Sequence, residues 1–457
     1  MLKKVFIATL VAAFALSGCK KEPGSKYVKR QRPPVVKQAE PTLPPADQLG
    51  EKTTFELTYH GITGKDDDLP ANGGWGFGSD NVDSPFVKAV KKKANNKLYI
   101  SRNHFLYDRE FAPIEYKGKK VLYAYFDING DGKLSDDEQL SPATDISERN
   151  RRGGGSTVFI TPDFTVTDDM GNNMPFRVML WVGFHGNFKP NVTWSPMSVF
   201  EGTAEMNGQE MRMYLFPNFQ SKCFTQYGRG SYGLVPASKE KKGHISQPQF
   251  SSLIVHEKNF YRVTVDEVNP DTQTIKISLI EDKTPRGKIA LDIKGKGEFK
   301  NKLNHANLQG DTDKTIYFSI NKGMNELPTG DYSISYGSFR YGKDNIDKYF
   351  TSFRNIPAFA IKADETTMVE LGKPEVKVQA VEENKRYNHD KAYKTEFTKD
   401  TAIYIDAIFV GMAKETYRGF EQKIKKGNRS RREDIKARIL ITDSEGNEVV
   451  NKEMEYG

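Results

Sequence analysis

The stretch Val199-Phe-Glu-Gly-Thr-Ala-Glu-Met-Asn-Gly-Gln-Glu-Met-Arg-Met-Tyr-Leu-Phe216 determines the expected fold class of this chain. Two runs of alternating side chains meet at Asn207-Gly208. Asn-Gly is the preferred pair for a two-residue hairpin turn, because both residues tolerate positive φ. The stretch therefore predicts a β-hairpin.

Short runs of this kind, separated by turn residues such as the glycine-rich segment 73–78, continue through the chain after Lys52. Further strands are predicted at 53–59, 97–101, 119–126, 157–161, 176–184, 253–256, 260–265, 274–280, 289–293, 315–320, 327–334, 358–371, 375–379, 403–409, 437–442 and 447–450. Only residues 84–95 favour a modest helix. We expect a mainly β protein with little helix, built as several β-sandwich-like modules in tandem.

A stretch of twelve residues directly follows the predicted strand at 119–126. It carries oxygen-bearing side chains at alternate positions and reads Asp127-Ile-Asn-Gly-Asp-Gly-Lys-Leu-Ser-Asp-Asp-Glu138. The stretch resembles the calcium loop of the EF-hand superfamily. Ca²⁺ prefers six to eight oxygen ligands, and a chain that curls around the ion supplies them from alternate residues. The resemblance implies a Ca²⁺ site with Gly132 at its sharp turn and the following ligands: Asp127, Asn129, Asp131, Lys133 through its carbonyl, Ser135, and Glu138 as a bidentate carboxylate.

Two departures from the EF-hand pattern shape this prediction. Gln139 replaces a hydrophobic residue after the loop, so the exiting helix is expected to be short, and Lys119–Phe126 favours a strand in place of an entering helix. Isolated loops of extracellular modules bind calcium with Kd on the order of 10⁻⁴ to 10⁻³ M. We therefore expect a structural calcium ion; the alternative is an acidic turn without metal.

The N-terminal residues 1–18 have the pattern of a secretory signal peptide. Lys3-Lys4 precedes the apolar run Val5–Leu16, which is too short to span a bilayer, and Leu16-Ser-Gly-Cys19 follows. This pattern resembles the cleavage site of bacterial lipoproteins, which implies that Cys19 is lipidated. The implied location is the cell envelope outside the cytoplasm, with the outer membrane or cell surface favoured by Lys20. The alternative is a cysteine within an ordinary signal peptide.

Residues 19–50 are expected to form a disordered tether, because they are rich in proline and charge and have almost no apolar pattern. The basic cluster at 26–32 is either part of a solvated linker or a contact for anionic lipid or cell-wall polymer. The net charge of +8 is small for 457 residues, so no nucleic-acid partner is expected. Cys223 is the only other cysteine, which leaves no intramolecular disulfide if Cys19 is lipidated.

Four folded modules are predicted after the tether. They are a β-rich module with the EF-hand-like loop at 51–195, a β-rich module at 196–286, a β-sandwich-like module at 287–380 and a small β domain at 381–457. The second module is a candidate degenerate repeat, because Met206–Phe216 aligns with Tyr116–Phe126, although generic hairpin similarity also produces such matches.

Two local features belong to the last two modules. Leu327-Pro-Thr-Gly-Asp-Tyr332 resembles the turn and strand of transthyretin-like or carboxypeptidase-regulatory-like β-sandwiches. The basic segment Lys423–Arg432 is expected to be an exposed loop; contact with an anionic envelope polymer is the alternative.

No motif in the sequence predicts catalysis. Gly228–Gly233 fits G-x-G-x-x-G, but Pro236 follows where a nucleotide-binding helix would start. Carboxylate pairs for glycoside hydrolysis meet only in the folded chain, so they stay open. The acidic groups at 66–68 and 168–169 favour turns, with extra calcium oxygens as the alternative.

The expected function follows from the lipoprotein pattern and the calcium loop. We predict an envelope-anchored, calcium-binding lipoprotein with a binding or scaffolding role and polysaccharide as a candidate ligand. The alternative is a calcium-stabilised extracytoplasmic glycan hydrolase, although a role without catalysis is favoured. Four aromatic residues are candidates for a surface on which sugar rings stack; the alternative is that they lie in the core. They are Trp75, Phe77, Trp181 and Trp194.

Overall fold

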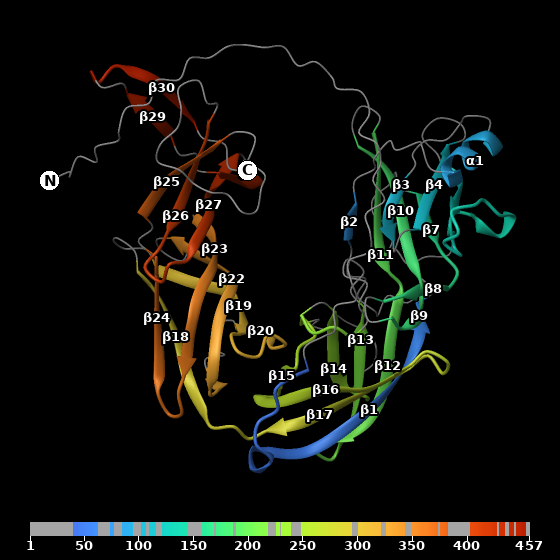
Figure 1. Cartoon of the computed structure of the whole chain (residues 1–457), viewed down its shortest axis with the longest axis horizontal. Coiled ribbons are helices and arrows are strands. Elements are labelled where there is room, and N and C mark those ends of the chain that lie inside the picture. Colours follow the sequence, from blue (N-terminus) through green and yellow to red (C-terminus); the bar gives the residue numbers. More distant parts are fainter. Residues whose placement is uncertain are drawn as a thin grey trace. The chain divides into compact units, whose positions relative to one another are not determined.

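The computed structural model describes most of the chain from residue 40 onward. The described residues are 40–62, 74–76, 85–94, 102–106, 109–115, 121–144, 157–168, 171–185, 189–217, 225–228, 230–238, 248–294, 300–320, 326–342, 349–372, 375–382, 403–426, 429–434, 438–442 and 445–453. Strands dominate them, and they contain one α-helix (Figure 1). The predicted mainly β fold with little helix is confirmed.

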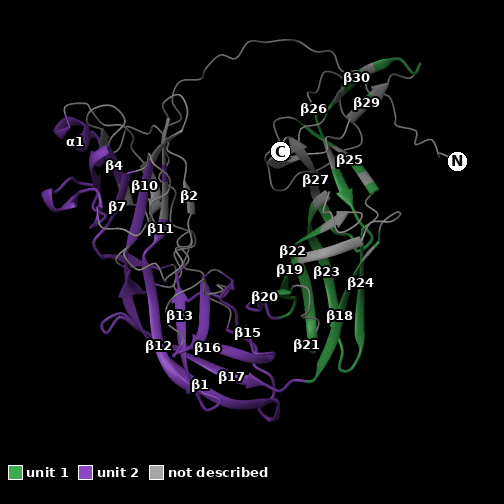
Figure 2. Ribbon diagram, turned by 180° about the vertical axis from the view of Figure 1, so that it is seen from behind, with its two compact units in different colours: residues 1–32, 285–312, 319–457 green, residues 33–284, 313–318 purple. Residues whose placement is uncertain are grey.

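The described chain forms two compact units, which Figure 2 distinguishes by colour. Unit 2 spans residues 33–284 and 313–318, and unit 1 takes in residues 285–312 and 319–457. The short segment 313–318 therefore belongs to unit 2, although unit 1 residues flank it on both sides.

The main sheet of unit 2 has seven strands in the order β14-β13-β12-β1-β17-β16-β15. Their bounds are β1 Leu49–Gly61, β12 Ser198–Met206, β13 Gln209–Phe216, β14 Ser231–Pro236, β15 Leu253–His256, β16 Asn259–Asn269 and β17 Thr274–Asp282. The central strand β1 pairs antiparallel with β17 through most of its length, and with β12 over residues 58–61. The predicted hairpin at 199–216 is confirmed as β12 and β13.

The described residues of unit 2 also form three smaller sheets, in the orders β2-β11-β10-β7, β3-β4-β5-β6 and β8-β9. Their bounds are β2 Gly74–Gly76, β3 Arg102–Leu106, β4 Arg109–Glu115, β5 Val121–Phe126, β6 Gln139–Leu140, β7 Thr157–Ile160, β8 Phe164–Thr167, β9 Asn173–Phe176, β10 Val178–His185 and β11 Lys189–Pro196. The glycine-rich segment predicted as a turn thus supplies an edge strand, because β2 pairs with β11.

The single described α-helix, α1, spans Pro85–Lys93 and confirms the helix predicted at 84–95. Pro85 occupies its first position, where a missing N–H costs no hydrogen bond. Lys91, Lys92 and Lys93 lie in its last turn, where positive charge is favourable to the helix dipole. The described part of the chain also contains two 3₁₀ helices, η1 Ala46–Gln48 and η2 Asp136–Glu138. No helix in the described residues is long and apolar enough to cross a membrane.

A continuous core joins the sheets of unit 2. It runs from the main sheet through β5, β7 and the β8-β9 pair, so the strand that leads into the acidic loop is anchored in the same core. Its largest fully buried side chains are Phe55, Phe126, Phe159, Phe176, Phe200 and Phe250.

Unit 1 contains sheets in the orders β21-β18-β24, β20-β19-β22-β23-β27-β26-β25 with β28 beside β27, and β29-β30. The bounds are β18 Arg286–Lys294, β19 Lys300–Gly310, β20 Tyr317–Ile320, β21 Glu326–Pro328, β22 Gly330–Gly342, β23 Tyr349–Ile361, β24 Thr366–Gly372, β25 Glu375–Glu382, β26 Ile403–Val410, β27 Thr416–Lys426, β28 Arg429–Asp434, β29 Arg438–Thr442 and β30 Glu448–Glu453.

The described strands are grouped differently from the four predicted modules. The boundary at 195/196 separates β1 from β12, which lie side by side in one sheet, and the boundary at 380/381 falls inside β25. The basic segment Lys423–Arg432 is not a loop throughout, because β27 and β28 pair across it. The expected tether includes the start of β1 at Leu49, while residues 1–39 lie outside the described part.

Candidate metal centre

The acidic loop Asp127–Glu138 connects two antiparallel strands, β5 and β6. Ala124 pairs with Leu140 and Tyr125 pairs with Gln139, so the loop closes a hairpin. The strand predicted before the loop is confirmed, and the short exit is the single 3₁₀ turn η2. Helices do not flank this loop as they would in an EF-hand pair.

Two glycines let the backbone curl within this loop. Gly130 has φ 73° and Gly132 has φ 71°, in the left-handed region that side chains with a Cβ disfavour. A Cβ on Gly132 would meet no atom within 4 Å, so glycine is required there by backbone conformation and not by space. The sharp turn expected at this position is therefore present.

The first three acidic or amide side chains accept hydrogen bonds from loop amides. The Asp127 carboxylate accepts from Gly130 N at 2.7 Å and from Gly132 N at 3.3 Å. Asn129 Oδ1 accepts from Asp131 N at 2.9 Å, and Asp131 Oδ1 accepts from Lys133 N at 2.7 Å. The bonds of Asn129 and Asp131 each span two residues and fold the loop backbone into successive turns.

Glu138 joins the beginning of the loop to its end. Its Oε1 accepts from Ile128 N at 3.1 Å and its Oε2 accepts from Ser135 N at 2.9 Å. The side chains of Glu138 and Asp127 are both buried, each about 1 % exposed. Burial raises the pKa of Glu138, and the negative charge of Asp127 raises it further. A cation beside these two carboxylates would offset the free-energy cost of keeping both negative charges buried.

The structure brings together some of the predicted ligands but not all. Each of the six residues takes part in a hydrogen bond within the loop, and Glu138 is bonded to Ile128 N at the start of the loop. In the described residues, however, no three His, Cys, Asp or Glu side chains gather closely enough to count as a metal-binding group. The donor set fits calcium because it consists of carboxylate, amide, hydroxyl and carbonyl oxygens. Lys133 would contribute its main-chain carbonyl.

The loop rests on a small apolar cluster that includes helix α1. Leu134, at the eighth loop position, packs against this cluster. The buried members of the cluster are Phe86, Val87, Val90, Ala94, Ala112 and Tyr125. Lys93 in the last turn of α1 pairs with Asp136 of η2. Their hydrogen bond, together with the attraction of their charges, raises the pKa of Lys93 and lowers the pKa of Asp136.

A row of aromatic rings holds the other end of the loop. Phe126 lies directly before Asp127, and its ring packs edge-on against Phe164 at a centroid distance of 5.2 Å. Phe164 packs in turn against Phe176 at 5.8 Å. Such edge-to-face pairs contribute about 0.5–1.5 kcal/mol each beyond burial. Asp127, the first predicted ligand, thus directly follows a residue of the unit 2 core.

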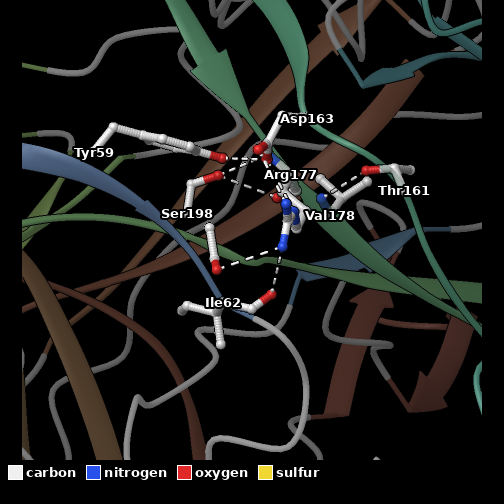
Figure 3. Close-up of polar contacts among 8 residues, drawn as sticks. Tyr59, Ile62, Thr161, Asp163, Arg177, Val178 and Ser198 are labelled. Atoms are coloured by element: carbon white, nitrogen blue, oxygen red, sulfur yellow. Dashed lines mark hydrogen bonds and ion pairs between the residues drawn. The ribbon is translucent and has the colours of Figure 1, made fainter. Parts of the chain in front are cut away.

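The residues beside this row form a polar cluster that the sequence did not reveal (Figure 3). Arg177 donates to both carboxylate oxygens of Asp163, at 2.9 and 3.0 Å, and Tyr59 donates to Asp163 at 2.6 Å. Arg177 also reaches the carbonyls of Gly61 and Ile62, and its backbone N donates to the Ser198 hydroxyl at 2.7 Å. The cluster connects the end of β1, the start of β12 and the start of β10.

The hydrogen bonds of this cluster hold separate strands of unit 2 together, so its role is structural. Burial and the hydrogen bond to Asp163 raise the pKa of Tyr59, so the phenol stays protonated at neutral pH. The bidentate pairing fixes the guanidinium of Arg177. The three residues are distant in sequence, and no local spacing signals their meeting.

Other buried carboxylates of the described chain are also engaged in local structure. Asp282 accepts from Arg262 Nε at 2.7 Å, and Glu415 accepts from Gly372 N, Ala413 N and the Tyr417 hydroxyl. Asp168 accepts from Asn172 N at 2.8 Å within its own turn. Asp168 therefore closes an acidic turn, which is the favoured reading of its sequence.

Several further predicted residues have defined positions. Trp181 is buried at 3 % exposure in a cluster with Val158 and Met179, so it has a core role and no sugar-stacking surface. Gly228 has φ 78° and lies against Tyr317, in a turn before strand β14. Trp75 and Trp194 lie in β2 and β11. The remaining predicted residues, Cys19, Cys223, Phe77 and the acidic groups 66–68 and 169, lie outside the described residues.

Comparison of the chain with protein-family models, with curated proteins and with solved structures found no match.

Proposed function

We propose that this protein is an envelope-anchored lipoprotein whose loop Asp127–Glu138 binds one structural Ca²⁺ ion. The observation that carries the calcium proposal is the position of Glu138, whose buried carboxylate spans from Ile128 N to Ser135 N beside the buried Asp127. Two buried carboxylates near one another are unfavourable unless a cation or several donors compensate them. Calcium would hold the two ends of the loop together.

The proposed place in the cell follows from the signal-peptide pattern that ends at Cys19. An extracytoplasmic location suits a loop of this type, because free calcium is abundant there and weak sites stay occupied. The proposed role of the β-rich body is binding or scaffolding in the envelope, with polysaccharide as the candidate ligand.

The calcium proposal is tested by thermal unfolding of the protein in excess calcium and in chelator. At about one hundred times Kd, a ligand adds about 2.7 kcal/mol to the stability of the native state. We expect a calcium-dependent rise in Tm that Asp127→Ala abolishes. Asp137→Asn is the matched control, because it removes one exposed negative charge from the same loop at a position that is not a predicted ligand. Identical melts with calcium and chelator would contradict the proposal.

The binding role is tested by retention on immobilised polysaccharides with calcium present. Retention without release of reducing ends supports a binding or scaffolding protein. Release of reducing ends that stops after a single carboxylate substitution would instead identify a glycan hydrolase and overturn the proposed role.

A further inference from the structure

Helix α1 and the second half of the acidic loop share one apolar cluster. Leu134 packs on the cluster that Phe86, Val87 and Val90 of α1 form with Ala112 and Tyr125. Leu134 stands between Lys133 and Ser135, two predicted ligand positions. A shift of Leu134 would therefore move both neighbouring ligands.

Polar contacts reinforce the same junction. Lys93 of α1 pairs with Asp136 of η2, two residues before Glu138. The Lys93 ammonium also lies 5.4 Å from the centre of the Tyr125 ring, and the Tyr125 hydroxyl donates to Gln139 Oε1 at 2.9 Å. The C-terminal turn of α1 thus contacts both η2 and the strand pair that the loop connects.

The helix cannot be stable by its own hydrogen bonds. It has nine residues, and isolated helices shorter than about 12–15 residues are marginal in water. Its formation depends on burial of Phe86, Val87 and Val90, each 0 % exposed. Part of the surface that buries them is contributed through Leu134 of the loop.

We propose that α1 is the supporting element of the calcium site, so that calcium binding and docking of α1 stabilise each other. This inference rests on the proposed calcium function. An EF-hand loop is held by the helices on either side of it; here a helix from an earlier part of the chain supports the loop at Leu134 and at Asp136. Coupling between two sites is reciprocal, so calcium protects α1 by the same factor by which docked α1 tightens calcium.

The coupling is tested in the full chain by hydrogen exchange with and without calcium, together with calcium titration of variants. We expect calcium to slow amide exchange in both the loop and α1. Leu134→Ala is expected to weaken calcium binding by about tenfold, within the usual range of coupling. Leu122→Ala is the matched control, because Leu122 is 40 % exposed on β5 and lies outside the shared cluster.

A second variant guards against a folding defect in Leu134→Ala. Lys93→Gln removes the contact with Asp136 from an exposed position, and we expect it to weaken calcium binding by a smaller factor that shrinks at high salt. Calcium protection of the loop without protection of α1, with both variants binding calcium as the wild type does, overturns the inference and leaves the calcium function intact. Absence of calcium binding in the wild type overturns both.

Discussion

Arg262 and Asp282 form a buried ion pair on neighbouring strands β16 and β17. Their side chains are 8 % and 0 % exposed, and Asp282 also accepts from Thr284 N at 2.8 Å. Removal of two charges from water is costly, and good geometry with further hydrogen bonds repays it. Loss of either partner would leave an uncompensated charge in the sheet.

We predict that Asp282→Ala lowers the free energy of unfolding of its unit by about 3–5 kcal/mol. Glu267→Ala is the control, since it breaks the exposed pair with Lys276 and should lower the free energy of unfolding far less. Urea denaturation of both variants measures the difference. Equal losses of stability would contradict the prediction, because the buried Arg262–Asp282 pair would then contribute no more to the free energy of unfolding than the exposed pair.

The sequence predicts single residues well only where their partners are local. The alternate oxygens from Asp127 to Glu138 and the positive φ of Gly132 follow from spacing within twelve residues. Tyr59, Asp163 and Arg177 were missed because their pairing depends on how distant strands meet. A local sequence pattern does not show which distant strands will lie side by side.

At the scale of elements, the turn of the β12-β13 hairpin is set by two left-handed residues. Asn207 has φ 54° and Gly208 has φ 74°, the conformation of a type I′ turn. This turn matches the right-handed twist of the flanking strands. The register that it fixes aligns Met206 with Gln209 and Phe200 with Leu215.

We predict that Gly208→Ala destabilises unit 2 by about 1–2 kcal/mol, the usual cost of a Cβ in the left-handed region. A Cβ at this position would meet no atom within 4 Å, so the loss reports backbone strain alone. Asn207→Gly tolerates the same φ and is expected to change stability little. Thermal unfolding of the two variants checks the prediction, and an unchanged Tm for Gly208→Ala would refute it.

Elements with strong local patterns were predicted, and elements defined by pairing were not. Residues 84–95 and Lys119–Phe126 gave a helix and a strand as expected. The basic segment Lys423–Arg432 was predicted as a loop because its charges repel, yet β27 and β28 pair across it. Within the described residues β28 pairs only with β27, and exposed edge strands tolerate Lys and Arg.

At the scale of the whole molecule, the two units have separate stabilising features. Unit 2 contains the acidic loop and the Arg262–Asp282 pair. Unit 1 contains Glu415, whose buried carboxylate joins Gly372 N, Ala413 N and the Tyr417 hydroxyl. Separate cores generally give separate unfolding transitions.

We predict two calorimetric transitions that respond to different changes. Asp282→Ala and calcium are expected to shift the same transition, in opposite directions, because both act on unit 2. Glu415→Ala leaves buried donors without their acceptor and should lower the Tm of the other transition. A single transition that moves as one with all three changes would contradict independent units.

Module boundaries were the least predictable level. Strand β1 pairs with β12 and β17, more than a hundred residues later in the chain, so its sheet partners have no local signal. The change of unit at 284/285 lies close to the predicted boundary at 286/287, where the composition of the chain changes. The other module boundaries depend on which distant strands pair, and the sequence does not show this.

The position of segment 313–318 in the chain determines when unit 2 can finish folding during synthesis. Thr315 donates to the Ser252 hydroxyl, Tyr317 N donates to the Ser251 hydroxyl, and the ring of Tyr317 packs on the unit 2 core. A ribosome delivers the chain from its N-terminus at about 5–20 residues per second. Residues 285–312 must therefore be synthesised before unit 2 receives its last segment, and until then Ser251 and Ser252 lack the hydrogen bonds from Tyr317 and Thr315.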